Sequence, residues 1–174
     1  MFWIQFVTNF LKILRAGQTP RQIAGGFALG SIVGLSPSFT LQGLCVWLII
    51  LVFDVNLSAA FFAFATFGLI AYIFDPLFHS LGYFLLVDIE GLKGIWTALY
   101  NAPIAPLTRF NNTVVLGSLV AALILSFPVY AGMKRFVIAY REHIHARIEK
   151  WKIYQILSRN SLVKWYQRIR DLGV

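Results

Sequence analysis

A run of uncharged residues at 23–53 constrains the fold of this chain more than any other feature. These 31 residues contain no Asp, Glu, Lys or Arg, which is typical of a membrane segment rather than of a soluble helix or strand. One straight helix would be roughly 46 Å long, against a hydrocarbon core of about 30 Å. Pro37 also removes a backbone donor and clashes with the preceding turn. The sequence therefore predicts two arms, 23–35 and 39–53, that form either a re-entrant hairpin or one kinked, tilted crossing.

Composition and charge extend this interpretation to the whole chain. Of the 174 residues, 59% are hydrophobic and only 13% are charged, as in integral membrane proteins. Ten of the fifteen Lys and Arg follow Met133, and three precede Gln22. Because cytoplasmic segments carry the excess of Lys and Arg, we expect both termini in the cytoplasm and an even number of crossings. The N-terminal residues lack a basic n-region and a small-residue cleavage site, so no cleaved signal peptide is expected.

The predicted fold class is all-α. We expect a polytopic integral membrane protein with Pro-broken or re-entrant helical hairpins and amphipathic interfacial helices at both ends. Residues 1–18 are predicted to form the N-terminal interfacial helix, 19–133 the membrane domain, and 134–174 a basic cytoplasmic amphipathic tail that breaks at 158–161. The membrane domain is expected to comprise broken hairpins at 20–53 and 57–87, an extracytoplasmic loop at 88–112, and a transmembrane helix at 113–133.

Small and polar residues in the apolar part indicate where helices pack. Gly26, Gly30 and Gly34 are four residues apart, a spacing that lets another helix backbone come close. Gln42 follows Pro37 at membrane depth, so we expect it to face protein or a water-filled cavity.

Asp75 and His79 are the ionisable pair of the apolar part. They are four apart, on one face of a helix, and such a pair inside a membrane segment is a functional hypothesis by default. Asp75 before Pro76 also fits a helix N-cap followed by proline at the first helical position. His79 equally fits a hydrogen-bonded packing residue. Both interpretations stay open from the sequence.

Basic and aromatic residues near the two ends predict binding to a membrane surface. Basic amphipathic helices with Trp beside a membrane span bind the bilayer and its anionic lipids. Nucleic acid is not expected as a partner, because no recognised nucleic-acid-binding fold is indicated. The predicted surface-binding residues are Trp3, Lys12, Arg15, Lys134, Arg135, Arg141, Arg147, Lys150, Trp151 and Lys152.

Signals for catalysis and for metal binding are not found. The sequence has no Gly-rich phosphate loop, no Gly-x-Ser-x-Gly and no His-Glu-x-x-His motif. Cys45 is the only cysteine, and His143 and His145 fall on different helix faces. We therefore expect neither an enzyme nor a cofactor nor a metal site.

One stretch carries a resemblance to a known family. The sequence Ala28-Leu29-Gly30-Ser31-Ile32-Val33-Gly34-Leu35-Ser36-Pro37, followed by Gln42, Asn56, Asp75-Pro76 and Tyr83, resembles the bacterial membrane proteins of the domain of unknown function 2062 family. The resemblance covers roughly residues 20–87. Asp75 stands where the family usually has Asn, and Ser58 stands where it usually has Pro.

The resemblance implies a location and a partner. The long basic tail is similar to a subgroup found beside AsmA-like proteins, the bridge-like class implicated in carrying phospholipid toward the outer membrane. It implies a non-enzymatic component of the bacterial inner (cytoplasmic) membrane in lipid transport. The alternatives are a stand-alone small transporter or scramblase, proton-coupled through Asp75 and His79, and a scaffold that recruits partners through its tail. A groove for lipid or partner is expected at Gly26, Gly30, Gly34, Ser36, Pro37, Gln42, Asp75, Pro76 and His79.

Overall fold

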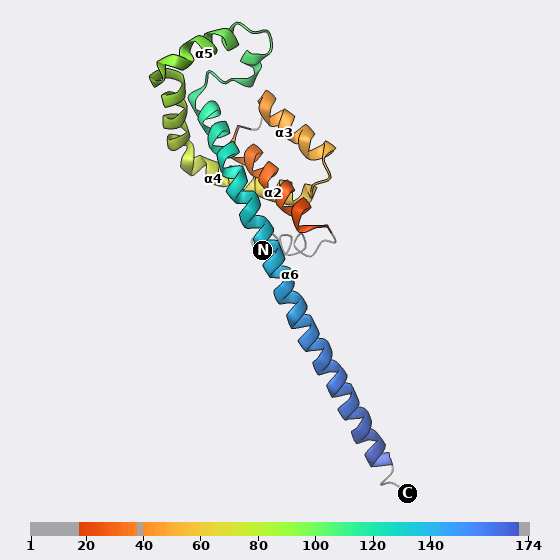
Figure 1. Cartoon of the computed structure of the whole chain (residues 1–174). Helices are drawn as coiled ribbons and strands as arrows, with labels where there is room; N and C mark the ends of the chain where they lie inside the picture. Colours follow the sequence, from red (N-terminus) through yellow and green to blue (C-terminus); the bar gives the residue numbers. More distant parts are fainter. Residues whose placement is uncertain (1–17, 38–39, 171–174) are drawn as a thin grey trace. The chain divides into compact units, whose positions relative to one another are not determined.

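The computed structural model describes the backbone of residues 18–37 and 40–170, and the side chains in these ranges up to residue 143. Within these ranges every regular element is helical, and no strand is formed. The α-helices are α2 (Pro20–Leu35), α3 (Leu41–Val52), α4 (Leu57–Tyr83), α5 (Lys93–Tyr100) and α6 (Thr113–Arg170) (Figure 1). The all-helical prediction is therefore confirmed. The interfacial helix predicted at 1–18 lies outside the described residues, apart from its last residue.

The N-terminus of α2 is fixed by a capping box and by the turn that precedes α4. Gln22 N–H donates to Thr19 Oγ1 (3.3 Å), and Thr19 N–H donates to Gln22 Oε1 (2.8 Å). Pro20 occupies the first turn, where its missing N–H costs no helical hydrogen bond. Gln22 Nε2 donates to Asp54 Oδ2 (2.6 Å), and the Gln22 carbonyl accepts from the Asn56 N–H (3.0 Å). These bonds hold the 53–56 turn against the start of α2.

α2 ends just before Pro37, and the chain turns back into α3. Ser36 has extended dihedral angles (φ −98°, ψ 151°), and Thr40 then caps α3 with its side-chain hydroxyl. The two arms pack against each other, because Val33 of α2 and Ile50 of α3 belong to one buried cluster. Figure 1 shows α2 and α3 side by side. The arms therefore form a helical hairpin rather than one kinked helix.

The glycines of α2 lie against the backbone of α4. A Cβ added to Gly30 would lie 2.7 Å from the Cα of Ala60, and one added to Gly34 would lie 2.8 Å from the carbonyl oxygen of Phe64. Gly26 lies equally close to the start of α4. Small residues at this spacing let two helix backbones touch, so the prediction of close helix packing is confirmed.

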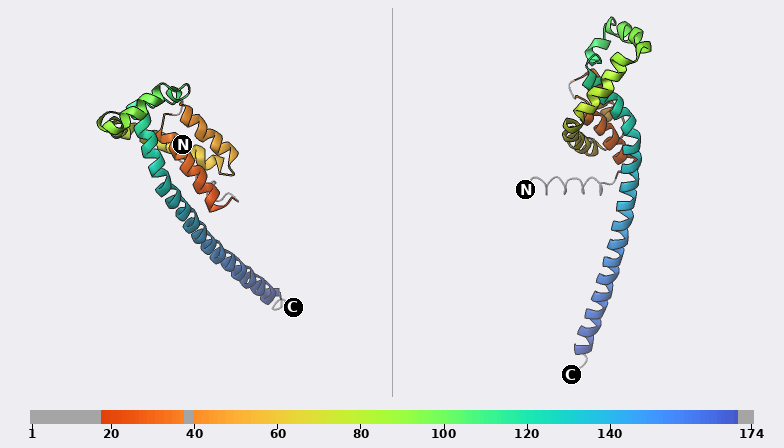
Figure 2. Two further views of the ribbon diagram at one scale, coloured as in Figure 1. Left: turned by 45° about the horizontal axis from the view of Figure 1, so that its top comes forward. Right: turned by 90° about the vertical axis from the view of Figure 1, so that its left-hand side faces the viewer.

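α4 continues through Pro76, where the sequence predicted the break of a second hairpin. The helix is one element with the proline inside it. A proline in a helix interior costs about 3 kcal/mol, and packing of the segment beyond it offsets that cost. Phe78 is buried, and a Cβ added to Gly82 would lie 2.6 Å from the carbonyl carbon of Thr113 in α6. One bent helix thus replaces the hairpin predicted at 57–87, and Figure 2 shows the change of direction in the yellow-to-green part of the chain.

Short helical turns fill residues 84–112, which include the loop predicted at 88–112. A π-helical turn (Phe84–Asp88) is followed by a 3-10 turn (Glu90–Leu92), by α5, and by a second 3-10 turn (Ala105–Thr108). Trp96 links these turns, because its Nε1 donates to the Leu85 carbonyl (3.0 Å) and its ring stacks on Phe110 at a centroid distance of 5.8 Å. The segment is therefore folded rather than irregular.

α6 begins where the sequence predicts and ends later. Asn112 Oδ1 accepts from the N–H groups of Val114 (2.9 Å) and Val115 (3.2 Å) and so caps the helix. The break predicted at 158–161 is wrong, since the helix continues to Arg170. Ser, Arg and Asn each cost at most about 0.7 kcal/mol in a helix interior, which is too little to end it. By internal contacts the chain forms two units, 1–137 and 138–174, and the second unit is helical as far as Arg170.

Large apolar side chains lie on the outside of the first unit. Val52, Tyr72 and Phe127 are 80%, 79% and 79% exposed. Two of the described helical segments, Leu57–Asp88 and Thr113–His143, are long and apolar enough to cross a membrane, and only 17% and 28% of their apolar windows are buried in the protein. A soluble domain rarely exposes apolar surface of this extent. The predicted association with a membrane is therefore supported by two apolar helices.

Candidate functional site

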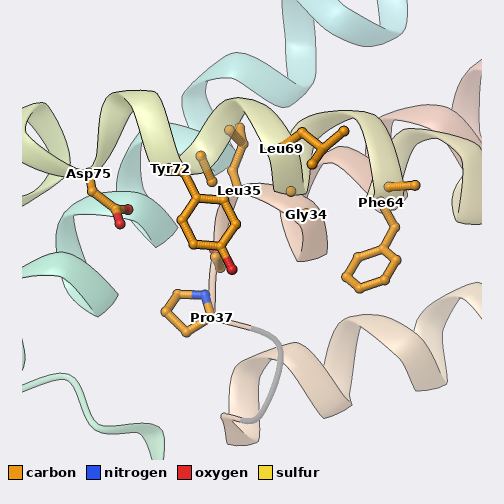
Figure 3. A pocket seen from close by; sticks show the side chains of 11 residues that line it. Gly34, Leu35, Pro37, Phe64, Leu69, Tyr72 and Asp75 are labelled. Carbon is orange, nitrogen blue, oxygen red and sulfur yellow. The ribbon is translucent and has the colours of Figure 1, made fainter.

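A pocket of about 520 Å³ lies where the end of α2 meets the middle of α4 (Figure 3). That volume is within the range of small-molecule sites, about 300–1,000 Å³. The pocket is lined on one side by the end of α2 and the residues that follow it, and on the other side by α4. The lining residues are Gly34, Leu35, Ser36, Pro37, Phe64, Ala65, Gly68, Leu69, Ala71, Tyr72 and Asp75.

The C-terminal cap of α2 supplies one polar group to this pocket. Ser36 leaves the helix in an extended conformation, while its N–H still donates to the Ile32 carbonyl (3.1 Å). The residue is 5% exposed, and its Oγ is buried without a hydrogen-bond partner in the described part of the chain. A buried hydroxyl without a partner costs about 1–3 kcal/mol, so a ligand group that bonds Ser36 Oγ would recover that free energy.

The middle of α4 supplies a carboxylate. Asp75 is half-buried and has neither a hydrogen bond nor an ion pair to any residue that the structure describes. The next residue, Pro76, has no N–H to donate to the carbonyl of Tyr72, its usual acceptor one turn earlier. Figure 3 shows the Asp75 carboxylate and the Tyr72 ring extending from α4 toward the side on which Pro37 lies. The α4 wall of the pocket therefore carries oxygen atoms as well as apolar surface.

The other walls are apolar. Leu35, Phe64 and Leu69 contribute hydrocarbon and aromatic surface. Gly68 leaves room between the helices, since a Cβ added there would meet only the Gly34 carbonyl oxygen, at 3.8 Å. Among the lining residues that the structure describes, none carries a positive charge. The pocket thus combines an apolar body with a carboxylate and a hydroxyl, and it suits an amphipathic ligand.

The nine residues predicted to form a groove are not all in one place. Gly34, Ser36, Pro37 and Asp75 line the pocket, and Pro76 adjoins it in sequence. Gly26 and Gly30 are covered by the backbone of α4 and are packing residues. The interpretation of Asp75 as an N-cap is wrong, because it lies inside α4 rather than before its first turn.

Gln42 and His79 are not among the lining residues. Gln42 is half-buried, with an Oε1 that is shielded from solvent and has no partner in the described residues, as expected of a side chain that faces protein. His79 Nδ1 is 2.7 Å from Thr113 Oγ1 of α6, as expected of a hydrogen-bonded histidine, but its side chain is exposed and not packed in the interior. The Asp75 and His79 side chains are not bonded to each other.

The sequence interpretation missed the α4 wall of the pocket. Phe64, Gly68, Tyr72 and Asp75 recur at spacings of three and four, which places them on one face of a helix. Continuing the face of Asp75 toward the N-terminus of α4 would have found them. That step required α4 to be one helix across Pro76.

The predicted surface-binding residues are only partly described. The side chain of Lys134 is half-buried and that of Arg135 is exposed. For Arg147, Lys150, Trp151 and Lys152 the structure describes a helical backbone alone, and Trp3, Lys12 and Arg15 lie outside the described residues. No group of three His, Cys, Asp or Glu suited to a metal ion occurs among the described residues. Binding to anionic lipids stays a prediction.

Comparisons with known proteins place the chain among bacterial relatives. The family described as "Uncharacterized protein conserved in bacteria (DUF2062)" matches residues 5–145, a longer range than the 20–87 suggested by the sequence motifs. A protein of Treponema pallidum (strain Nichols), named as an uncharacterized protein, is 27% identical over 161 residues, which are 92% of this chain and 99% of the relative. No solved structure matches.

Proposed function

The chain belongs to the domain of unknown function 2062 family of bacteria, and on that premise we propose that it is a non-enzymatic protein of the inner membrane that binds phospholipid. In this proposal it partners a periplasmic, bridge-like AsmA-like protein that carries phospholipid toward the outer membrane. The pocket between α2 and α4 is where lipid would enter or reorient.

The observation that carries the proposal is the chemistry of this pocket within an apolar exterior. Its walls are apolar, its polar atoms lie near Ser36 and Asp75, and exposed apolar side chains of α4 such as Leu69 and Tyr72 border it. A phospholipid has the same division between acyl chains and a polar headgroup. A lipid could therefore reach the pocket from the side without crossing a polar surface.

The proposed membrane arrangement follows from helix lengths and charge. Leu57–Asp88 and Thr113–His143 would cross the bilayer. α2 and α3, with 16 and 12 residues, are about 24 and 18 Å long and too short to cross, so their hairpin would be re-entrant. Both termini would be cytoplasmic, with residues 88–112 on the far side, because Lys and Arg concentrate near the ends.

The experiment is purification of the tagged full-length protein in a mild detergent, with identification of the co-purifying proteins and lipids. The proposal expects phospholipid and a large periplasmic AsmA-like protein in stoichiometric amount. The protein without phospholipid would refute the binding role. Phospholipid without a partner would instead favour the stand-alone transporter or scramblase, and a cytoplasmic partner lost on deletion of 134–174 would favour the scaffold.

A matched pair of variants locates the lipid. Gly68→Leu adds a side chain where the pocket has room, whereas Gly132→Leu adds the same side chain where nothing lies within 4 Å. We expect Gly68→Leu to lower the amount of bound phospholipid and Gly132→Leu to leave it unchanged. Equal lipid in both variants would place the lipid elsewhere on the protein.

A further inference from the structure

Resting on the proposed function, we propose that the pocket selects phospholipids whose headgroup carries a primary ammonium group. Asp75 is the counter-ion of that ammonium, and Ser36 Oγ accepts one of its hydrogen bonds. The selected class is phosphatidylethanolamine, in preference to phosphatidylglycerol and phosphatidylcholine.

The Asp75 carboxylate is isolated from the other described side chains. It lies within the apolar segment Leu57–Asp88, yet it has no bond to any described residue. Two other carboxylates of the first unit do have partners: Asp54 accepts from Gln22 (2.6 Å), and Glu90 lies 3.4 Å from Lys93 Nζ. A carboxylate in apolar surroundings is costly unless a cation or donor compensates it. None of the described residues that line the pocket is basic, so the ligand is the source of the cation.

The buried Ser36 hydroxyl supports the same ligand independently of Asp75. Ser36 is 5% exposed, it lines the same pocket as Asp75, and its Oγ has no hydrogen-bond partner in the described residues. Pro76 also leaves the Tyr72 carbonyl without its usual helical donor. These groups are acceptors, and a primary ammonium presents three N–H donors to satisfy them.

The remaining lipid classes fit this set of atoms less well. A choline headgroup is cationic, but its quaternary nitrogen has no N–H to donate. Phosphatidylglycerol brings net negative charge toward the Asp75 carboxylate, and like charges repel. A bare sodium or potassium ion would neutralise the Asp75 carboxylate, but it would leave most of the 520 Å³ pocket unfilled and its apolar walls without contacts.

The test uses the full-length protein reconstituted in vesicles of equal parts phosphatidylethanolamine, phosphatidylglycerol and phosphatidylcholine. The protein is re-extracted in mild detergent, and the retained lipids are quantified by class. For the wild type we expect phosphatidylethanolamine to be enriched on the order of tenfold over the other two, the ratio that one charge-assisted contact of about 1.4 kcal/mol supplies. Asp75→Asn should retain a similar total amount of lipid with enrichment reduced to about one.

Controls separate the site from the general charge of the protein. Asp88→Asn removes an exposed carboxylate that does not line the pocket, so it should keep the wild-type enrichment. Ser36→Ala should lower the enrichment without removing it, and it gives a second test if Asp75→Asn fails to fold. Soluble phosphoethanolamine and sodium chloride, added separately at re-extraction, show whether the headgroup alone or a metal ion displaces the retained lipid.

The outcomes distinguish this inference from the function on which it rests. Retained phospholipid without a headgroup preference, or a preference that survives in Asp75→Asn, would overturn the ammonium site and leave lipid binding intact. No retained phospholipid of any class would overturn the proposed function itself. Displacement by sodium chloride but not by phosphoethanolamine would assign Asp75 to a metal ion and overturn the inference.

Discussion

Replacing Gly30 by alanine should destabilise the protein by forcing α2 and α4 apart. The added Cβ would lie 2.7 Å from both the Cα and the carbonyl carbon of Ala60, whereas ordinary contacts begin at 3.4 Å. The carbonyl oxygen of Ala60 would lie closer still, so the two helices must separate by more than about 0.7 Å, because a backbone cannot rotate away as a side chain can. Gly26 and Gly34 share this interface and lose contact in the same movement.

The magnitude is set by two opposing effects. Overpacking of a closely packed interior costs about 1–3 kcal/mol, and contact with backbone puts this case at the upper end. Replacement of Gly by Ala within a helix stabilises the helix by up to about 1 kcal/mol. Gly132→Ala in α6 gains the same stabilisation, and its added Cβ meets nothing within 4 Å, so it is the matched control. We expect Gly30→Ala to be about 2 kcal/mol less stable than wild type and about 3 kcal/mol less stable than Gly132→Ala.

Thermal unfolding of the two purified variants in one detergent measures this difference. Trp47 packs on Phe61 at a centroid distance of 4.9 Å, so its fluorescence reports on the contact between α3 and α4. At roughly 2–4 °C per kcal/mol for a chain of this size, the melting temperature of Gly30→Ala should fall by about 4–8 °C. A melting temperature equal to that of Gly132→Ala would refute the close contact of the two backbones.

Three further predictions concern the caps, the bend and the topology. Asn56→Ala should lower the free energy of unfolding by about 1–2 kcal/mol in the same assay, because the 5% exposed Asn56 caps α4 by accepting the Ala59 N–H at its Oδ1 (2.6 Å). An unchanged melting temperature would contradict that role. Pro76→Ala should straighten α4. With spin labels at positions 58 and 88 in a Cys45→Ala background, the distance between the labels should then rise toward about 45 Å; an unchanged distance would show that the proline does not cause the bend. In the Cys45→Ala background, an impermeant maleimide added from the periplasm should label Gly91→Cys and not Ser158→Cys. Equal labelling of the two variants would exclude a topology with the tail in the cytoplasm and 88–112 on the far side.

Local signals in the sequence were sufficient where the structure is set by a few neighbouring residues. The Thr19-Pro20 start of α2, the exit from the helix before Pro37 and the Asn112 cap of α6 all depend on hydrogen bonds within three or four residues. The contact between α2 and α4 could be anticipated as close packing, since glycines four apart admit another backbone. The sequence did not show which helix would pack on the glycine face of α2, because α4 is distant in sequence and begins only after the 53–56 turn.

The two prolines show why the pocket itself could not be predicted. The sequence around them is similar, Pro37-x-Phe39-x-x-x-Gly43 and Pro76-x-Phe78-x-x-x-Gly82, and a broken hairpin was predicted at each, 20–53 and 57–87. Pro37 lies outside a helix, whereas Pro76 lies within α4, and the difference comes from a contact distant in sequence. A Cβ on Gly117 of α6 would lie 2.8 Å from the Phe78 carbonyl carbon, so α6 supports the segment beyond Pro76.

That contact also changes what Asp75 can do. As an N-cap its carboxylate would accept from the backbone N–H groups of the following turn and would need no other partner. Inside a continuous α4 those N–H groups are already bonded to carbonyls of the preceding turn. The carboxylate is left to face the pocket that Ser36 also lines. The packing of α6 against α4 is therefore the structural cause of the unpaired charge, and Gly117→Leu, which separates these helices, should weaken the headgroup preference without altering any residue of the pocket.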